Sequence, residues 1–208
     1  MKAIVLGRIL GNLAALTACY EQASKEGCDV LAHTGDVVGP GPFPSDCVRF
    51  LRERNIPGVR GRREEALTGQ SGRLHAADRL WLQNLPFELR LALGPREMAI
   101  FHAGPISLMD ALDRAMPEEA LTAAGKEAGA GIVVVASSQP WHRLAGGHHF
   151  VAAPAVDRPG TFQTGYAVIV SESTVQATFR EVPMGQEPQR PAPDPQSAHR
   201  GAEIVPRS

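Results

Sequence analysis

Short apolar runs alternate with segments of helical periodicity over the first sixty residues. Ala3–Leu6 is an apolar run, and the chain after Gly11 places apolar side chains at the spacing of one helix face, at Leu13, Leu16, Tyr20 and Ala23. The same order recurs with Val30–Ala32 and the glycine- and proline-rich loop Gly35–Pro44, after which Ser45 is expected to cap a helix. Another strand is predicted around Gly58–Arg60. This alternation predicts an α/β sheet whose functional loops follow the carboxyl ends of the strands.

The second half of the chain is richer in strand patterns. We predict a helix that ends near Leu85, a hairpin formed by Glu88–Leu93 and Glu97–Phe101, and one or two alanine-rich helices between Ser107 and Ala128. The fully apolar Ile132–Val135 is typical of a buried strand. The remaining predicted strands are His149–Ala152 and the antiparallel pair Thr164–Ser171 and Val175–Glu181.

Length and composition fit one domain and a tail. The chain has 208 residues, of which 43% are hydrophobic, enough for one core. We expect a domain over residues 1–182 and a proline-rich C-terminal tail over 183–208, because the tail lacks apolar periodicity.

Charge, hydropathy and cysteine content exclude several classes of protein. The formal net charge of −1 does not indicate the strongly basic surface that nucleic-acid binding usually needs, so we do not expect a nucleic-acid partner. No apolar stretch approaches the roughly 18–20 residues of a membrane span, and the N-terminus resembles a strand rather than a signal peptide. The cysteines Cys19, Cys28 and Cys47 have no metal-site spacing. We therefore expect a cytoplasmic protein with no membrane partner.

Five loops carry the residues of chemical interest. The first contains Arg8-Ile9-Leu10-Gly11-Asn12, the second Gly35-Asp36 followed by Gly39-Pro40-Gly41-Pro42, and the third Gly61-Arg62-Arg63-Glu64. His102 follows an apolar run in the fourth, and the fifth reads Val135-Ala136-Ser137-Ser138-Gln139-Pro140. In order and spacing these loops resemble the signatures of the calcineurin-like metallophosphoesterase superfamily, in its small bacterial phosphodiesterase-like branch. The resemblance implies a four-layer α/β/β/α sandwich with mixed sheets.

The resemblance also implies a dinuclear metal site, but most of its ligand positions are changed. Asp36 and His102 remain, at the positions of a bridging carboxylate and a histidine ligand. The other ligand positions hold residues that bind a divalent cation poorly or not at all, namely Arg8, Leu10, Arg62, Ala136 and Ser138. Arg63 occupies the position of a histidine that contacts substrate phosphate in the family. We therefore expect no metal cofactor, with manganese or another divalent metal required only if activity remains.

These changes predict a non-catalytic homologue that binds a phosphorylated small molecule or a protein partner. Arg8, Asn12, Arg62 and Arg63 are the candidate anion-binding residues, since guanidinium groups bind phosphate in a bidentate manner. The arginines could instead form a salt-bridge network with Asp36, Glu64 and Glu65. One alternative is a residual metal-dependent phosphodiesterase or phosphatase that uses Asp36 and His102. Another is a structural protein that forms homo-oligomers.

Other polar side chains have structural interpretations. We expect Asn12 to stabilise the start of a helix and Trp141 to be a packing anchor. His142, His148 and His149 suggest a displaced metal site, but neighbouring residues of a strand point to opposite faces, which argues against one.

Overall fold

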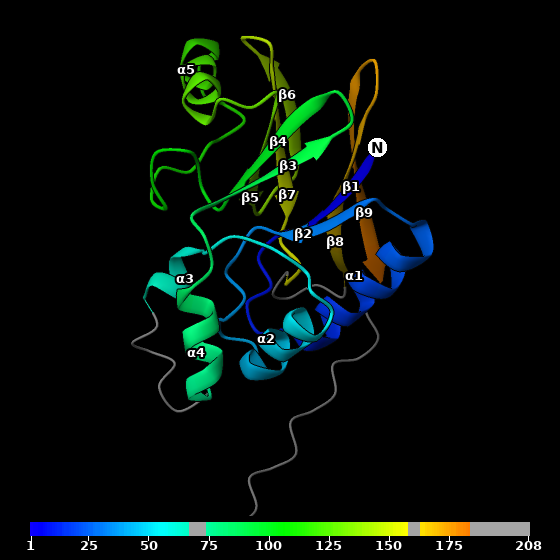
Figure 1. The fold of residues 1–208 in the computed structure, drawn as a ribbon, viewed down its shortest axis with the longest axis vertical. Coiled ribbons are helices and arrows are strands. Elements are labelled where there is room, and N and C mark those ends of the chain that lie inside the picture. Colours follow the sequence, from blue (N-terminus) through cyan, green and yellow to red (C-terminus); the bar gives the residue numbers. More distant parts are fainter. Residues whose placement is uncertain (67–73, 158–162, 184–208) are drawn as a thin grey trace, which may run out of the picture.

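A computed structural model describes residues 1–66, 74–157 and 163–183, whose strands form two sheets (Figure 1). The first sheet has the order β2 (Val30–His33), β1 (Lys2–Leu6), β8 (Gln163–Ser171) and β9 (Val175–Pro183). The second has the order β3 (Glu88–Leu93), β4 (Arg96–Phe101), β5 (Ile132–Ser137), β7 (His148–Pro154) and β6 (Trp141–Ala145). Both sheets are mixed. In the first, β1 pairs parallel with β2 and antiparallel with β8. In the second, β5 lies parallel between β4 and β7, and the edge strands β3 and β6 are antiparallel to their neighbours.

Helices cover the outer faces of the two sheets. The helices α1 (Leu13–Glu26), α2 (Pro44–Glu53) and α4 (Ala76–Gln83) share a core with β1 and β8. The helix α5 (Glu118–Ala128) packs on the second sheet, well away from α1 in Figure 1. The short α3 (Arg62–Glu65) lies between the second loop and α4. None of the helices in these described ranges is long and apolar enough to cross a membrane.

The side-chain alternation of each strand explains the layers. Ile4 and Leu6 of β1 point into the core shared with α1 and α2, whereas Ala3 and Val5 point into a core between the sheets. In the same way β5 contributes Ile132 and Val134 to the core between the sheets, and Val133 and Val135 to the core under α5. Three cores therefore separate four layers, which confirms the predicted α/β/β/α sandwich.

Most of the predicted elements are present, but two predictions are wrong and one strand was not predicted. Ser45 lies inside α2, which starts with Pro44 at its first turn, where the missing N–H of proline has no cost. Residues 58–60 form no strand, only a bridge from Gly58 to His33, because Arg60 N donates to the carbonyl of Pro86 instead of continuing the ladder. The edge strand β6 was not predicted.

The alanine-rich region forms one helix. Within residues 107–128 the helix is confined to Glu118–Ala128. The strand β9 runs to Pro183, and the predicted tail beyond that residue lies outside the described part of the chain.

Candidate functional site

The first, second and fourth candidate loops directly follow strands β1, β2 and β4 at their carboxyl ends, whereas the fifth begins inside β5 and continues past its end at Ser137. The third loop begins at Gly61 and leads into α3. Backbone hydrogen bonds join the loops, since Ile9 N and Leu10 N donate to the carbonyl of Asp36, and Ala136 N donates to the carbonyl of His102. The first loop is therefore joined to the second, and the fourth to the fifth.

Asp36 belongs to the second loop and is 2% exposed. It has a positive φ of 49°, a conformation that aspartate tolerates better than most residues, after Gly35 with a φ of 84°. Its Oδ1 accepts a hydrogen bond of 3.0 Å from Arg63 N, and its Oδ2 lies 3.8 Å from Arg63 Nε. The carboxylate of Asp36 is thus bound by the backbone and side chain of Arg63.

Glu64 is a second buried carboxylate beside Asp36, also 2% exposed. Its Oε2 accepts hydrogen bonds of 2.8 Å from Asp36 N and Gly61 N, and its Oε1 accepts one of 3.2 Å from Val38 N. Burial, and then the nearby charge of Asp36, raises the pKa of Glu64 to about 7, although the backbone donors act in the opposite direction. Glu64 therefore connects the second loop to the third.

His102 faces Asp36 from the second sheet and is 3% exposed. Its Nδ1 lies 2.8 Å from the carbonyl oxygen of Thr34, so Nδ1 carries the proton and donates, and a neutral ring presents the lone pair of Nε2. This Nε2 lies 3.6 Å from Asp36 Oδ1. Burial lowers the pKa of His102, and the charges of Arg62 and Arg8 lower it further against the effect of Asp36. A neutral imidazole is therefore expected at pH 7.

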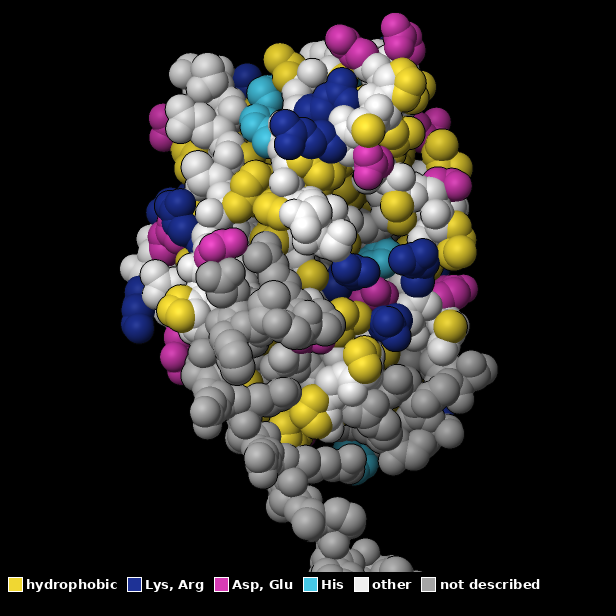
Figure 2. Space-filling view, turned by 180° about the vertical axis from the view of Figure 1, so that it is seen from behind, with side chains coloured by type: hydrophobic (Ala, Val, Ile, Leu, Met, Phe, Trp, Pro, Cys, Tyr) yellow, Lys and Arg dark blue, Asp and Glu magenta, His cyan; other side chains and the backbone are white. Residues whose placement is uncertain are grey.

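Arg8 and Arg62 line a cavity of about 250 Å³ together with His102. We call it the arginine-lined cavity; its other walls are formed by residues 103, 111–113 and 136–138. Figure 2 shows basic side chains gathered around a histidine on one face of the molecule. The buried Nε of Arg8 has no hydrogen-bond partner among the described residues, and none of their carboxylates forms an ion pair with Arg8 or Arg62. The cavity therefore presents two guanidinium groups that have no carboxylate partner among the described residues.

The other two candidate anion-binding residues lie elsewhere on the surface. Arg63 contacts Asp36 and does not line the cavity. Asn12 accepts a hydrogen bond from Ala15 N as the N-cap of α1, and its Nδ2 donates to Asp157 Oδ1 at 3.0 Å. This geometry matches the expected role of Asn12 at the start of a helix.

The expected salt-bridge network forms only between Asp36 and Arg63. Glu64 accepts backbone N–H groups rather than guanidinium groups, and Glu65 turns away to pair with Arg60 Nε at 3.0 Å. The arginine-lined cavity is therefore not closed by carboxylates in the described residues.

The donor set fits a dinuclear metal site poorly. Asp36 and His102 provide two ligands, and two guanidinium groups line the space beside them, where their fixed charge repels a cation. Among residues 1–66, 74–157 and 163–183, no group of three or more His, Cys, Asp or Glu side chains is placed to hold a metal ion. No catalytic step through a metal is therefore derived from this arrangement.

Sequence reasoning did not identify two features of the site. Asp113 lines the arginine-lined cavity, but it follows an irregular loop and has no motif that would have identified it. The bridging role of Glu64 had a signal, because a glutamate at the third position of a helix commonly bonds back to the N-cap N–H, here that of Gly61.

The downstream histidines and Trp141 lie apart from the cavity. Trp141 is 5% exposed and packs in the core under α5, as expected of a packing anchor. His148 bonds to the carbonyl of Ala130, whereas His142 Nε2 lies 3.2 Å from His149 Nδ1. These contacts leave a pair of rings rather than a three-ligand site.

The comparisons with known proteins agree with this architecture. A family model described as calcineurin-like phosphoesterase matches residues 1–171. The structure is similar to a metallophosphoesterase from Sphaerobacter thermophilus, at 20% identity and a TM-score of 0.72, covering 89% of this chain and 90% of that one. It is also similar to the hypothetical protein PH1004 from Pyrococcus horikoshii OT3, at 20% identity and a TM-score of 0.73, covering 89% of each chain.

A more distant similarity is to Vps29 from Chaetomium thermophilum, at 10% identity and a TM-score of 0.54, covering 90% of this chain and 97% of that one. No curated protein matches the sequence. The structural similarities show the fold, and the family model covers most of the sequence. The chain therefore belongs to the calcineurin-like phosphoesterase family.

Proposed function

We propose that this protein is a pseudoenzyme of its family that binds a small phosphorylated or similarly anionic ligand in the arginine-lined cavity without hydrolysing it. The observation that carries the proposal is the pair of guanidinium groups, Arg8 and Arg62, that line one cavity without a carboxylate partner among the described residues. A buried guanidinium N–H without an acceptor is costly, and an anion supplies the acceptor.

The charge of the cavity walls supports an anionic ligand. Arg8 and Arg62 contribute two positive charges, Asp113 contributes one negative charge, and His102 is neutral, which leaves a balance of about one positive charge. The volume of about 250 Å³ lies below the roughly 300–1,000 Å³ of cavities that hold drug-sized ligands. The charge favours an anion, and the small volume favours a small phosphate compound over a nucleotide.

Calorimetric titration with inorganic phosphate and pyrophosphate tests the proposal. Each charge-assisted hydrogen bond contributes about 1.5–3 kcal/mol, so Arg8→Ala and Arg62→Ala are each expected to weaken binding by roughly 10- to 100-fold. Arg60→Ala is the matched control, because Arg60 pairs with Glu65 and does not line the cavity. No heat of binding for either anion, or an equal loss in Arg60→Ala, would overturn the proposal.

A residual metal-dependent phosphodiesterase is the second candidate. The observation that favours it is the short separation of 3.6 Å between His102 Nε2 and Asp36 Oδ1, which brings two family ligands together. Hydrolysis of a generic phosphodiester with added manganese, abolished by Asp36→Asn, would establish this enzyme. We expect no turnover above background and no stoichiometric metal in the purified protein by elemental analysis.

A further inference from the structure

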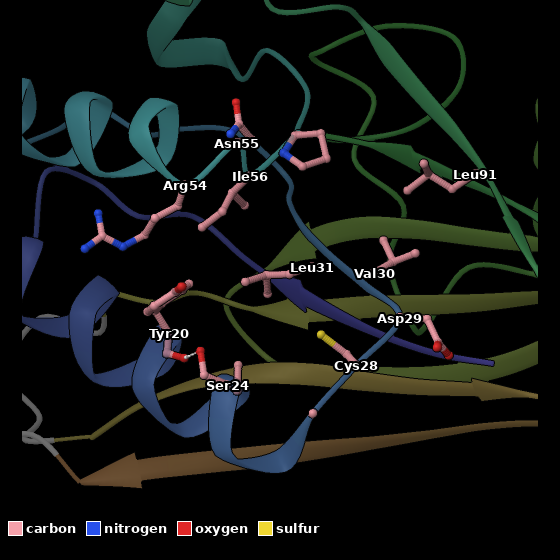
Figure 3. A pocket seen from close by; sticks show the side chains of 13 residues that line it. Tyr20, Ser24, Cys28, Asp29, Val30, Leu31, Arg54, Asn55, Ile56 and Leu91 are labelled. Carbon is pink, nitrogen blue, oxygen red and sulfur yellow. Dashed lines mark hydrogen bonds between the residues drawn. The ribbon is translucent and has the colours of Figure 1, made fainter.

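A second pocket lies at the other end of the first sheet, where α1 and α2 end and β2 begins (Figure 3). We call it the β2 pocket. Its volume is about 560 Å³, within the range of cavities that hold a ligand or a peptide side-chain cluster. The arginine-lined cavity is lined by Arg8, beyond the carboxyl end of β1, which runs parallel to β2, so the two sites lie at opposite ends of the first sheet and share no lining residue.

The β2 pocket has an apolar floor with opposite charges at its two ends. Leu31 and Val30 lie between Arg54 at one end and Asp29 at the other, and Leu91 lies across from Val30 at the Asp29 end (Figure 3). This arrangement suits an extended segment that has an acidic residue, then apolar residues, then a basic residue.

Both charged ends retain hydrogen-bonding capacity. The Arg54 guanidinium lies 3.8 Å from the centre of the Phe50 ring, and its Nη1 bonds to the carbonyl of Phe50 at 3.4 Å and lies 3.8 Å from Glu53 Oε2. Asp29 Oδ2 accepts from Lys2 N at 2.7 Å, while no donor to its Oδ1 is found among the described residues. At the same end, Lys2 Nζ donates to the carbonyl of Glu26 at 3.1 Å, so the C-terminal pole of α1 already has a cation beside it.

The chain itself contains a segment with this pattern, Glu203-Ile204-Val205-Pro206-Arg207, outside the described residues. We propose that residues 203–207 dock in the β2 pocket, with Glu203 against Arg54, the three apolar residues on the floor, and Arg207 against Asp29. The proline favours the extended conformation that this alignment needs, because it fixes its own φ and restricts the preceding residue.

The connecting residues are long enough for this contact within one chain. The strand β9 ends at Pro183, which pairs with Gln163 at the end of the sheet opposite to Asp29. Residues 184–202 span at most about 65 Å when extended, at roughly 3.3–3.6 Å per residue. A domain of this size has a radius of gyration of about 16 Å and hence a diameter of about 40 Å.

Cys28 provides a direct measurement, because it is exposed and lines the β2 pocket, whereas Cys19 and Cys47 are buried. A docked segment covers Cys28 and slows its reaction with a thiol reagent. A population docked to about 90% lowers the rate about tenfold, which corresponds to about 1.4 kcal/mol. We expect this protection in the full-length chain and its loss in Glu203→Arg, which repels Arg54 without changing the surroundings of Cys28.

The charge-reversed pair Glu203→Arg with Arg54→Glu is expected to restore the slow rate, and thermal melting checks that each variant is folded. Glu187→Arg is the matched control, since it changes the charge of the same tail outside the docking segment and should keep the wild-type rate. Equal rates in wild type and Glu203→Arg would overturn the proposal, as would equal acceleration in Glu187→Arg. Protection that grows with protein concentration would also overturn it, because a second copy would then supply the segment.

Discussion

Replacement of Glu64 by glutamine tests whether this buried carboxylate holds the site loops together. The two oxygens of Glu64 accept three backbone N–H groups, two at Oε2 and one at Oε1. A glutamine oxygen can still accept the N–H groups of Asp36 and Gly61, but the amide NH₂ then faces the N–H of Val38. An unsatisfied buried donor costs about 1–3 kcal/mol, and removal of the charge beside Asp36 offsets part of this. We expect the free energy of unfolding to fall by about 1–2 kcal/mol.

Guanidinium chloride unfolding at pH 7.5 measures this change as a lower midpoint at an unchanged slope. Glu64→Ala removes all three acceptors and should cost more, about 3–5 kcal/mol, a large share of the usual 5–15 kcal/mol. Glu65→Gln is the control, because the neighbouring Glu65 side chain is 60% exposed and an exposed pair contributes at most about 1 kcal/mol. Equal midpoints for Glu64→Gln and Glu65→Gln would refute the bridging role.

Three further predictions concern the same framework. The pKa of Glu64 is raised from 4.5 to about 7, so its contribution to stability is full below pH 4.5 and is lost as the pH rises through 7. Burial lowers the pKa of His33 from 6.5 to about 4, so its contribution is full above pH 6.5 and is lost as the pH falls through 4. In wild type these two trends oppose each other as the pH falls, whereas Glu64→Gln keeps only the trend of His33. Chemical denaturation of Glu64→Gln should therefore show the free energy of unfolding falling by about 2–3 kcal/mol between pH 6.5 and 4.5, a fall that wild type lacks. Asn12→Ala removes the N-cap of α1 and should lower the free energy of unfolding by about 1 kcal/mol, measured by chemical denaturation; an unchanged value would contradict the cap. Gly7→Ala places a Cβ 2.0 Å from the carbonyl oxygen of Pro154 and should abolish soluble folded protein, as judged by circular dichroism; a native spectrum and midpoint would show that the two chain segments can separate.

The apolar runs allowed β1 and β5 to be predicted as strands, and the family resemblance implied the four layers; which core each side chain enters could not be deduced from runs that are apolar throughout. The proximity of Asp36 and His102 was implied by the family resemblance, in which both occupy ligand positions of one site. The directions in which the side chains of Arg62 and Arg63 point could not be predicted from the sequence. Successive residues of a helix are rotated by about 100°, so at the start of α3 one faces the cavity and the other Asp36, depending on where the helix begins.

The strand β6 was missed for a related reason. Its five residues include His142 and Arg143, and a polar edge strand has little apolar alternation to reveal it. Its position depends on pairing with β7, a contact that single-sequence periodicity does not contain.

The distribution of carboxylates supports the proposal that the site binds an anion rather than a cation. Asp36 is engaged by Arg63, and Glu64 is engaged by three backbone N–H groups, so both buried acids already have partners within the protein. The bonds of Glu64 join the second and third loops without requiring a metal between them. Arg8 and Arg62 keep their charge at any physiological pH, and a neutral His102 cannot compensate for it. With Asp113 counted, the walls of the arginine-lined cavity keep a net charge of about one positive unit, which is consistent with the proposed phosphate-type ligand.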